Sequence, residues 1–209
     1  SNLFHSFREF NVRTGETAYF DNPLTIDNII TRVTGGNISN IDGLIRANGT
    51  ANLYLINPSG IIFGSNARLN IGGSFFSSTA DSIQFSDGSI FSAKNPRETP
   101  LLTINVPVGL QYGTNAASVE VRQSRLEVSP NQTLAFLGGN VSIDGGRLLA
   151  PGGEVVLGGL VGEGAIAIGS TTSFPVGVLR GNIALSNGAI ADVRSTNNGS
   201  ITVSANHLN

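Results

Sequence analysis

The chain has 209 residues with a formal net charge of −2, and 12% of its residues are charged while 40% are hydrophobic. Disordered chains are polar and highly charged, and proteins that grip phosphate backbones carry basic patches, so this composition excludes both classes and we expect no nucleic-acid partner. The chain lacks cysteine, which excludes disulfides, thiolate metal sites and cysteine nucleophiles. No apolar run approaches the about 18 residues of a membrane-spanning helix, and we expect one domain that is not embedded in a membrane.

The N-terminal segment is rich in aromatic residues around a Thr14-Gly15 turn. Aromatic and β-branched residues favour strands, and the open end of a β stack needs a cover for its apolar interior and its unpaired edges. We therefore predict a β-structured cap over about residues 1–30. Its apolar positions are Phe7, Phe10, Val12, Tyr19 and Phe20.

The next segment alternates glycine-rich turns with apolar runs. Residues 32–45 read RVTGGNISNIDGLI, and residues 51–64 read ANLYLINPSGIIFG. In the second stretch Asn57, Pro58 and Gly60 take the first, second and fourth positions of a strong β-turn, with Pro58 fixing φ. The turn either holds two apolar runs in register, which we favour, or presents its side chains to a partner.

The region of about residues 94–110 differs from its surroundings. It combines three prolines, Pro96, Pro100 and Pro107, with several charged residues. Proline together with charge indicates a surface excursion from the main body of the fold. Residues 101–106, which read LLTINV, are predicted to form a strand on the exterior.

The second half of the chain consists of very short apolar bursts with period two, the pattern of strands. No segment holds a helical period. Turn pairs punctuate the chain and are expected to supply positive φ angles. The bursts are residues 69–71, 118–121, 125–128, 141–143, 183–185 and 201–203, and the turn pairs are residues 42–43, 48–49, 87–88, 144–145, 187–188 and 198–199.

An internal similarity favours a solenoid over a sandwich or a barrel. Residues 139–148 read GNVSIDGGRL and residues 181–190 read GNIALSNGAI, and the likeness resumes at residues 153–157 and 199–203. In a solenoid, equivalent strands of successive coils stack at about 4.8 Å, and neighbouring coils stabilise one another. The coil pattern is still present at residues 206–209, and we expect it to continue in a longer parent.

Residues 32–64 closely resemble the secretion (TPS) domain of two-partner-secretion exoproteins, the family of filamentous haemagglutinins and high-molecular-weight adhesins, with a cyanobacterial-like style. The family's Asn-Pro-Asn-Gly-Ile motif is matched by Asn57, Pro58, Gly60 and Ile61, with Ser59 where asparagine is usual. Serine can also bond back to the backbone, so we expect the turn to survive. The resemblance extends to about residue 110. A secondary motif comprises Arg32, Gly35, Ser39, Asp42, Gly43 and Asn52.

The resemblance implies an all-β, right-handed parallel β-helix with an N-terminal β cap and extra-helical β elements. It also implies that residues 1–209 form one secretion domain at the N-terminal end of a longer β-helical exoprotein. The implied partner is an outer-membrane TpsB-type barrel of the Omp85 type, which recognises the domain through periplasmic POTRA domains. The chain would cross unfolded, fold outside and template the β-helix. We expect a secreted or cell-surface protein of a Gram-negative-type cell, acting as a monomer without a cofactor.

Two alternatives remain. Parallel β-helices that cleave polysaccharides need clustered carboxylates. The acids here are scattered, and His5 and His207 lie near opposite ends and are expected to be solvated, so we predict no enzyme, no catalytic residue and no metal site. The other alternative is an adhesion or carbohydrate-binding module. The dispersed acids are Asp21, Asp27, Asp42, Asp81, Asp87, Asp144 and Asp192, of which Asp81 is the one to inspect.

Overall fold

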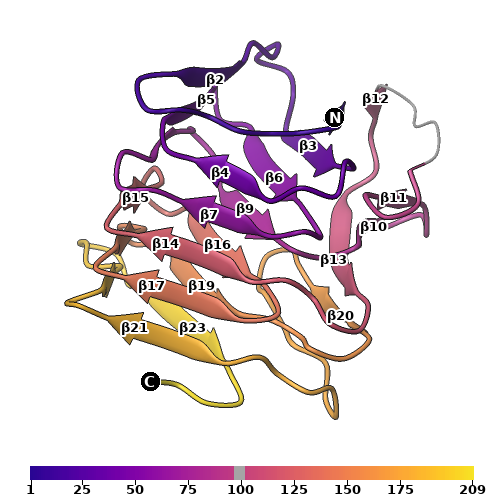
Figure 1. The fold of residues 1–209 in the computed structure, drawn as a ribbon. Coiled ribbons are helices and arrows are strands. Elements are labelled where there is room, and N and C mark those ends of the chain that lie inside the picture. The colour runs from indigo at the N-terminus through magenta and orange to yellow at the C-terminus, as the bar shows by residue number, and fades with distance from the viewer. Residues whose placement is uncertain (97–101) are drawn as a thin grey trace.

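The computed structural model describes residues 1–96 and 102–209, and every regular element in them is a strand (Figure 1). The chain winds into successive turns, and equivalent strands of these turns stack to form three faces. The first face is one sheet in the order β12-β1-β3-β6-β9-β16-β19-β23, and the second is β21-β17-β14-β7-β4. The third face consists of two sheets, β2-β5-β8 and β15-β18-β22. A fourth, outer sheet has the order β11-β10-β13-β20.

The strands of the first face are β1 (Asn2–Phe7), β3 (Asn28–Val33), β6 (Asn52–Ile56), β9 (Phe75–Ser78), β12 (Leu102–Thr103), β16 (Thr133–Leu137), β19 (Glu154–Gly158) and β23 (Ser200–Ser204). Those of the second face are β4 (Ser39–Ile41), β7 (Ile61–Phe63), β14 (Val119–Arg122), β17 (Val141–Asp144) and β21 (Ile183–Ser186). The third face has β2 (Thr17–Phe20), β5 (Leu44–Ala47), β8 (Arg68–Asn70), β15 (Arg125–Glu127), β18 (Arg147–Leu149) and β22 (Ile190–Asp192). The outer sheet has β10 (Ser82–Phe85), β11 (Ile90–Ser92), β13 (Pro107–Tyr112) and β20 (Gly164–Ala167).

In residues 1–96 and 102–209 the stacked strands of the three faces pair in parallel, except that β12 runs antiparallel to β1. The repeat read from the sequence is confirmed residue by residue. Val141 pairs with Ile183 on the second face, and Val155 pairs with Ile201 on the first. The fold is therefore the predicted all-β parallel β-helix.

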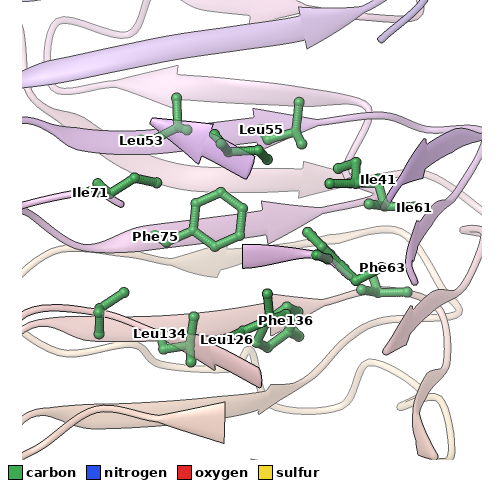
Figure 2. Close-up of a cluster of buried hydrophobic side chains, with 14 of the residues drawn as sticks. Ile41, Leu53, Leu55, Ile61, Phe63, Ile71, Phe75, Leu126, Leu134 and Phe136 are labelled. Atoms are coloured by element: carbon green, nitrogen blue, oxygen red, sulfur yellow. The ribbon is translucent and has the colours of Figure 1, made fainter. Parts of the chain in front are cut away.

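The interior of the stack is a continuous apolar column (Figure 2). Phe63, Phe75 and Phe136 meet at its centre, with the rings of Phe63 and Phe136 edge to face at 5.5 Å between centroids. Such aromatic pairs add to the stabilisation that burial alone provides. Successive turns cover one another's apolar residues, so each turn is stabilised by its neighbours.

The middle strands of the first face, β3, β6, β9, β16 and β19, are buried on both sides, since the outer sheet covers the side away from the column. A second apolar cluster lies between them, with Ile30 and Tyr54 from the first face and Ile83 and Leu110 from the outer sheet. All six residues of β3 are consequently buried. The outer sheet is antiparallel and combines two excursions, because β10, β11 and β13 lie between β9 and β14, whereas β20 follows β19.

The predicted subdivision into a cap and an excursion stays a prediction. Residues 97–101 of the excursion expected at about 94–110 lie outside the described residues. At the N-terminal end, β1 pairs with β3, β2 pairs with β5, and Val12 bridges to Ile41. The N-terminal segment thus contributes a strand or bridge to each of the three faces.

The turn glycines serve two different purposes. Gly49, Gly88, Gly145 and Gly188 have the positive φ expected of them, between 63° and 84°. Gly43 and Gly199 do not, so that part of the prediction is wrong. A Cβ on Gly43 would lie 2.5 Å from the carbonyl oxygens of Arg13 and Glu16, and one on Gly199 would lie 2.6 Å from that of Val193. These two are glycine because neighbouring backbone approaches closely.

Ser77 and Ser78 of β9 can be used to test whether the first face packs against the column on one side and the outer sheet on the other. Both are fully buried, but the Ser77 hydroxyl faces the column without a hydrogen-bond partner, whereas Ser78 Oγ bonds to the Tyr112 hydroxyl at 2.7 Å and accepts the amide of Ala80. A buried hydroxyl without a partner costs free energy. We expect Ser77→Ala to raise the free energy of unfolding by about 1 kcal/mol and Ser78→Ala to lower it by a similar amount. Urea unfolding measures both, and equal signs for the two variants would contradict the assignment.

Candidate functional site

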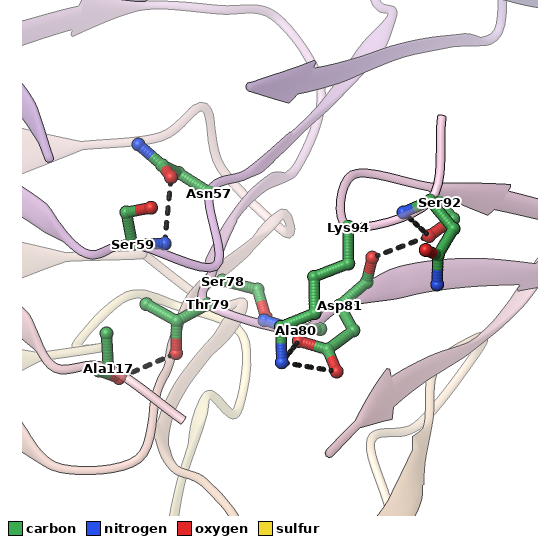
Figure 3. A network of polar contacts seen from close by, with 10 residues as sticks. Asn57, Ser59, Ser78, Thr79, Ala80, Asp81, Ser92, Lys94 and Ala117 are labelled. Atoms are coloured by element: carbon green, nitrogen blue, oxygen red, sulfur yellow. Dashed lines mark hydrogen bonds and ion pairs between the residues drawn. The ribbon is translucent and has the colours of Figure 1, made fainter. Parts of the chain in front are cut away.

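Asn57 occupies the corner between the first and second faces, directly after β6, and its side chain is fully buried. Its Nδ2 donates to the carbonyl oxygen of Asn37 and to Ser39 Oγ, both at 2.9 Å. Its Oδ1 accepts the amide of Ser59 at 2.9 Å (Figure 3). The amide group therefore ties this corner to the same corner of the preceding turn.

The predicted turn is present. The amide of Gly60 donates to the carbonyl oxygen of Asn57 at 3.1 Å, and Gly60 has a φ of 120°. The side chain that bonds back is Asn57 itself, and the Ser59 hydroxyl has no hydrogen bond with any described residue. Pro58 and Ser59 are partly exposed, while Ile61 is buried in the apolar column. Only the tip of the motif is accessible in the folded protein.

Of the secondary motif, Ser39 is the residue that meets the turn. It is buried beneath Asn57, and its amide donates to the carbonyl oxygen of Gly60 at 3.1 Å. Gly35 lies at the same corner of the preceding turn, where a Cβ would stand 2.2 Å from the carbonyl oxygen of Arg8. The stretch from Gly35 to Ser39 is thus the layer against which the turn of residues 57–60 packs.

Asp42 and Gly43 lie at a different corner, between the second and third faces. Asp42 accepts hydrogen bonds from Thr14 Oγ1 and from the amide and side chain of Asn66. These donors lower the pKa of Asp42 below its usual value. The carboxylate joins three successive turns, so its contacts are structural.

Arg32 points away from the column, into the cluster beneath the outer sheet. Its guanidinium lies 4.1 Å from the centroid of the Phe91 ring, and it donates to Ser6 Oγ and to the carbonyl oxygen of Ser92. Burial lowers the pKa of Arg32. The residue therefore fastens β11 to the first face.

Asn52 belongs to a ladder of side-chain amides that the sequence reasoning missed. Asn52 Nδ2 donates to Asn28 Oδ1, and Asn28 Nδ2 donates to Asn2 Oδ1, both at 2.9 Å. Asn52 Oδ1 in turn accepts the amide of Ser74. The signal was an asparagine opening each of three apolar runs, NLF, NII and NLY. The two motifs thus spread over several corners of the stack instead of forming one pocket.

Asp81 is the acid that the sequence singled out for inspection. Asp81 is paired with Lys94 at 3.0 Å (Figure 3). Within residues 1–96 and 102–209, no group of three or more His, Cys, Asp or Glu could hold a metal ion. In the same residues no helix is long and apolar enough to cross a membrane.

The family model described as the TPS secretion domain matches residues 1–206. The chain belongs to the TPS secretion domain family. This TPS domain is also similar to a curated relative, the heme/hemopexin-binding protein of Haemophilus influenzae, with 36% identity over 75 residues. That match covers 36% of this chain and 8% of the relative. The comparisons give no support to the cyanobacterial likeness.

The family assigns the TPS domain to a secreted or surface exoprotein of a Gram-negative cell that is exported with a partner transporter. The assignment is to a secretion module, not to a family of enzymes. Heme/hemopexin binding belongs to the relative's name, and the activity of this chain's parent is a separate question.

Proposed function

We propose that this TPS domain targets its exoprotein to an Omp85-type outer-membrane barrel through the POTRA domains of that barrel, and that it templates β-helix folding during export. The observation that carries the proposal is the Asn57 corner. Asn57 is fully buried and satisfied by groups from two turns, so in the folded state its side chain is not accessible to a partner. The motif of residues 57–61 therefore acts through folding, and a transporter that reads Asn57 itself reads the unfolded chain.

Templating is supported by the last turn. Ile201 and Val203 of β23 continue the apolar column but remain 47% and 40% exposed. A further turn stacked on β23 would bury these side chains and pair the free backbone edge. The stack therefore offers a surface on which further coils are stabilised as they form.

Recognition is supported by the backbone groups that an unfolded or partly folded chain leaves unpaired. Addition of an extended strand to a sheet edge is an established recognition mode. Only Pro58 and Ser59 of the central motif are partly exposed after folding. We propose that binding precedes folding and that the released domain, residues 1–209, is monomeric.

The proposal is tested by export. The domain is expressed behind a signal peptide with and without its candidate barrel, and the culture medium is assayed. Export that requires the barrel supports targeting. Export without a barrel, or retention in the periplasm beside a barrel that exports its own substrate, would overturn the proposal and favour the adhesion module.

A further inference from the structure

His5 is not the solvated residue that the sequence suggested. It lies on β1 with its ring stacked on Phe7 at 5.9 Å and edge to face with Phe20 at 5.2 Å between centroids. Its Nε2 is buried and has no hydrogen-bond partner. The ring thus helps to close the N-terminal end of the apolar column, where Phe7 packs against the core and Phe20 belongs to it.

The neighbouring strand, β3, places no anionic side chain beside the His5 ring. His5 pairs in register with Thr31 of β3, whose buried hydroxyl also lacks a partner. In the described part of the chain His5 makes no ion pair with a carboxylate. An imidazolium formed here would therefore lose hydration without gaining a counter-ion.

Charged groups on the neighbouring elements are engaged elsewhere or are solvated. Arg32 of β3 faces the opposite side of the sheet, against Phe91. Asp21, next to β2, accepts a hydrogen bond from Asn48, and Asp27 binds the N-terminal amine. Arg8, Glu9 and Glu16 are exposed at the ends of β1 and β2.

We propose that His5 makes the N-terminal turn of the β-helix a pH-sensitive closure, stable when the imidazole is neutral and opened when it takes up a proton. Opening would detach β1 and β2 and leave the outer edges of β3 and β5 unpaired. Protonation of His5 would thus control access to the edges of β3 and β5 at the N-terminal end of the stack.

The sign follows from proton linkage. Burial lowers the pKa of His5 below its ordinary value of 6.5, so the opened state binds the proton more tightly than the closed state. Closure is fully stable above pH 6.5 and weakens as the pH falls from 6.5 to the native pKa. Across that window the opening equilibrium rises about tenfold for each pH unit.

The test is hydrogen exchange of the amides in β1 and β2 between pH 7.5 and 5.5, with rates corrected for intrinsic exchange. We expect their protection to fall with acid while that of β17 stays constant. The effect should disappear in His5→Leu and persist in His207→Gln, which removes the other histidine of the chain. An NMR titration of the wild-type His5 ring gives an independent measurement, which does not depend on a variant that folds.

Three results would overturn the inference. Protection of β1 that stays constant across the range would show that protonation does not open the turn. An unchanged acid response in a folded His5→Leu would assign it to another group. A His5 pKa at or above 6.5 would show that the ring is not penalised by burial.

Discussion

Replacing Gly159 by alanine is expected to lower the free energy of unfolding by about 3 kcal/mol or more, and to abolish export of a folded domain. Gly159 follows β19 at the corner between the first and second faces, where a Cβ would lie 1.2 Å from the carbonyl oxygen of Gly138. That oxygen belongs to the backbone of the preceding turn, so relief requires the two turns to separate. Urea unfolding followed by circular dichroism measures the loss.

Gly169→Ala is the matched control. Apart from Gly169 itself and its two chain neighbours, no described residue has a heavy atom within 4 Å of a Cβ built at Gly169, and its φ is outside the positive range. We expect a change of less than about 0.5 kcal/mol. Equal stability of Gly159→Ala and Gly169→Ala would show that the turns are not stacked as closely as described.

Asn57→Ala should cost about 3 kcal/mol, because it removes three hydrogen bonds and leaves the buried Ser39 hydroxyl without its partner. Because the turn fixes where β7 begins, we also expect reduced yield of secreted, protease-resistant domain. Thermal unfolding of purified protein and the amount in the culture medium are the two measurements.

The contrasting variant is Ser59→Asn, which introduces the residue that is usual in related domains. The Ser59 hydroxyl bonds to no described residue, so we expect stability within about 0.5 kcal/mol of the wild type. If Asn57→Ala were as stable as the wild type but still not exported, the side chain would act by contact with the transporter, and the folding role assigned to Asn57 would be wrong.

The sequence was most informative where strands are covered on one side only. Residues 141–143 alternate buried Val141 and Ile143 with partly exposed Ser142, and both this segment and residues 183–185 form strands as predicted. The turn at residues 57–60 could also be predicted, since proline and glycine have well-defined conformational preferences.

The parts that escaped prediction depend on contacts between distant residues. The middle strands of the first face are buried on both sides, so strands such as β3 and β16 show no alternation of buried and exposed positions. Burial of His5 depends on Phe20 and Thr31, which the stacking brings beside it. Arg32 and Asp42, grouped as one motif by the family resemblance, lie apart, because Arg32 is within β3 beneath the outer sheet and Asp42 is at the corner between the second and third faces.

The outer sheet needs both excursions, so it can be completed only after the second excursion has been added. β13 pairs with β10 on one edge, but its other edge is filled by β20, which comes from residues 164–167. In a chain that folds as it emerges with its N-terminus first, β13 keeps one edge unpaired while the six strands from β14 to β19 are added to the three faces. In such a chain the outer sheet is completed late, because β20 lies at residues 164–167 and none of the earlier turns supplies the strand that pairs with this edge of β13.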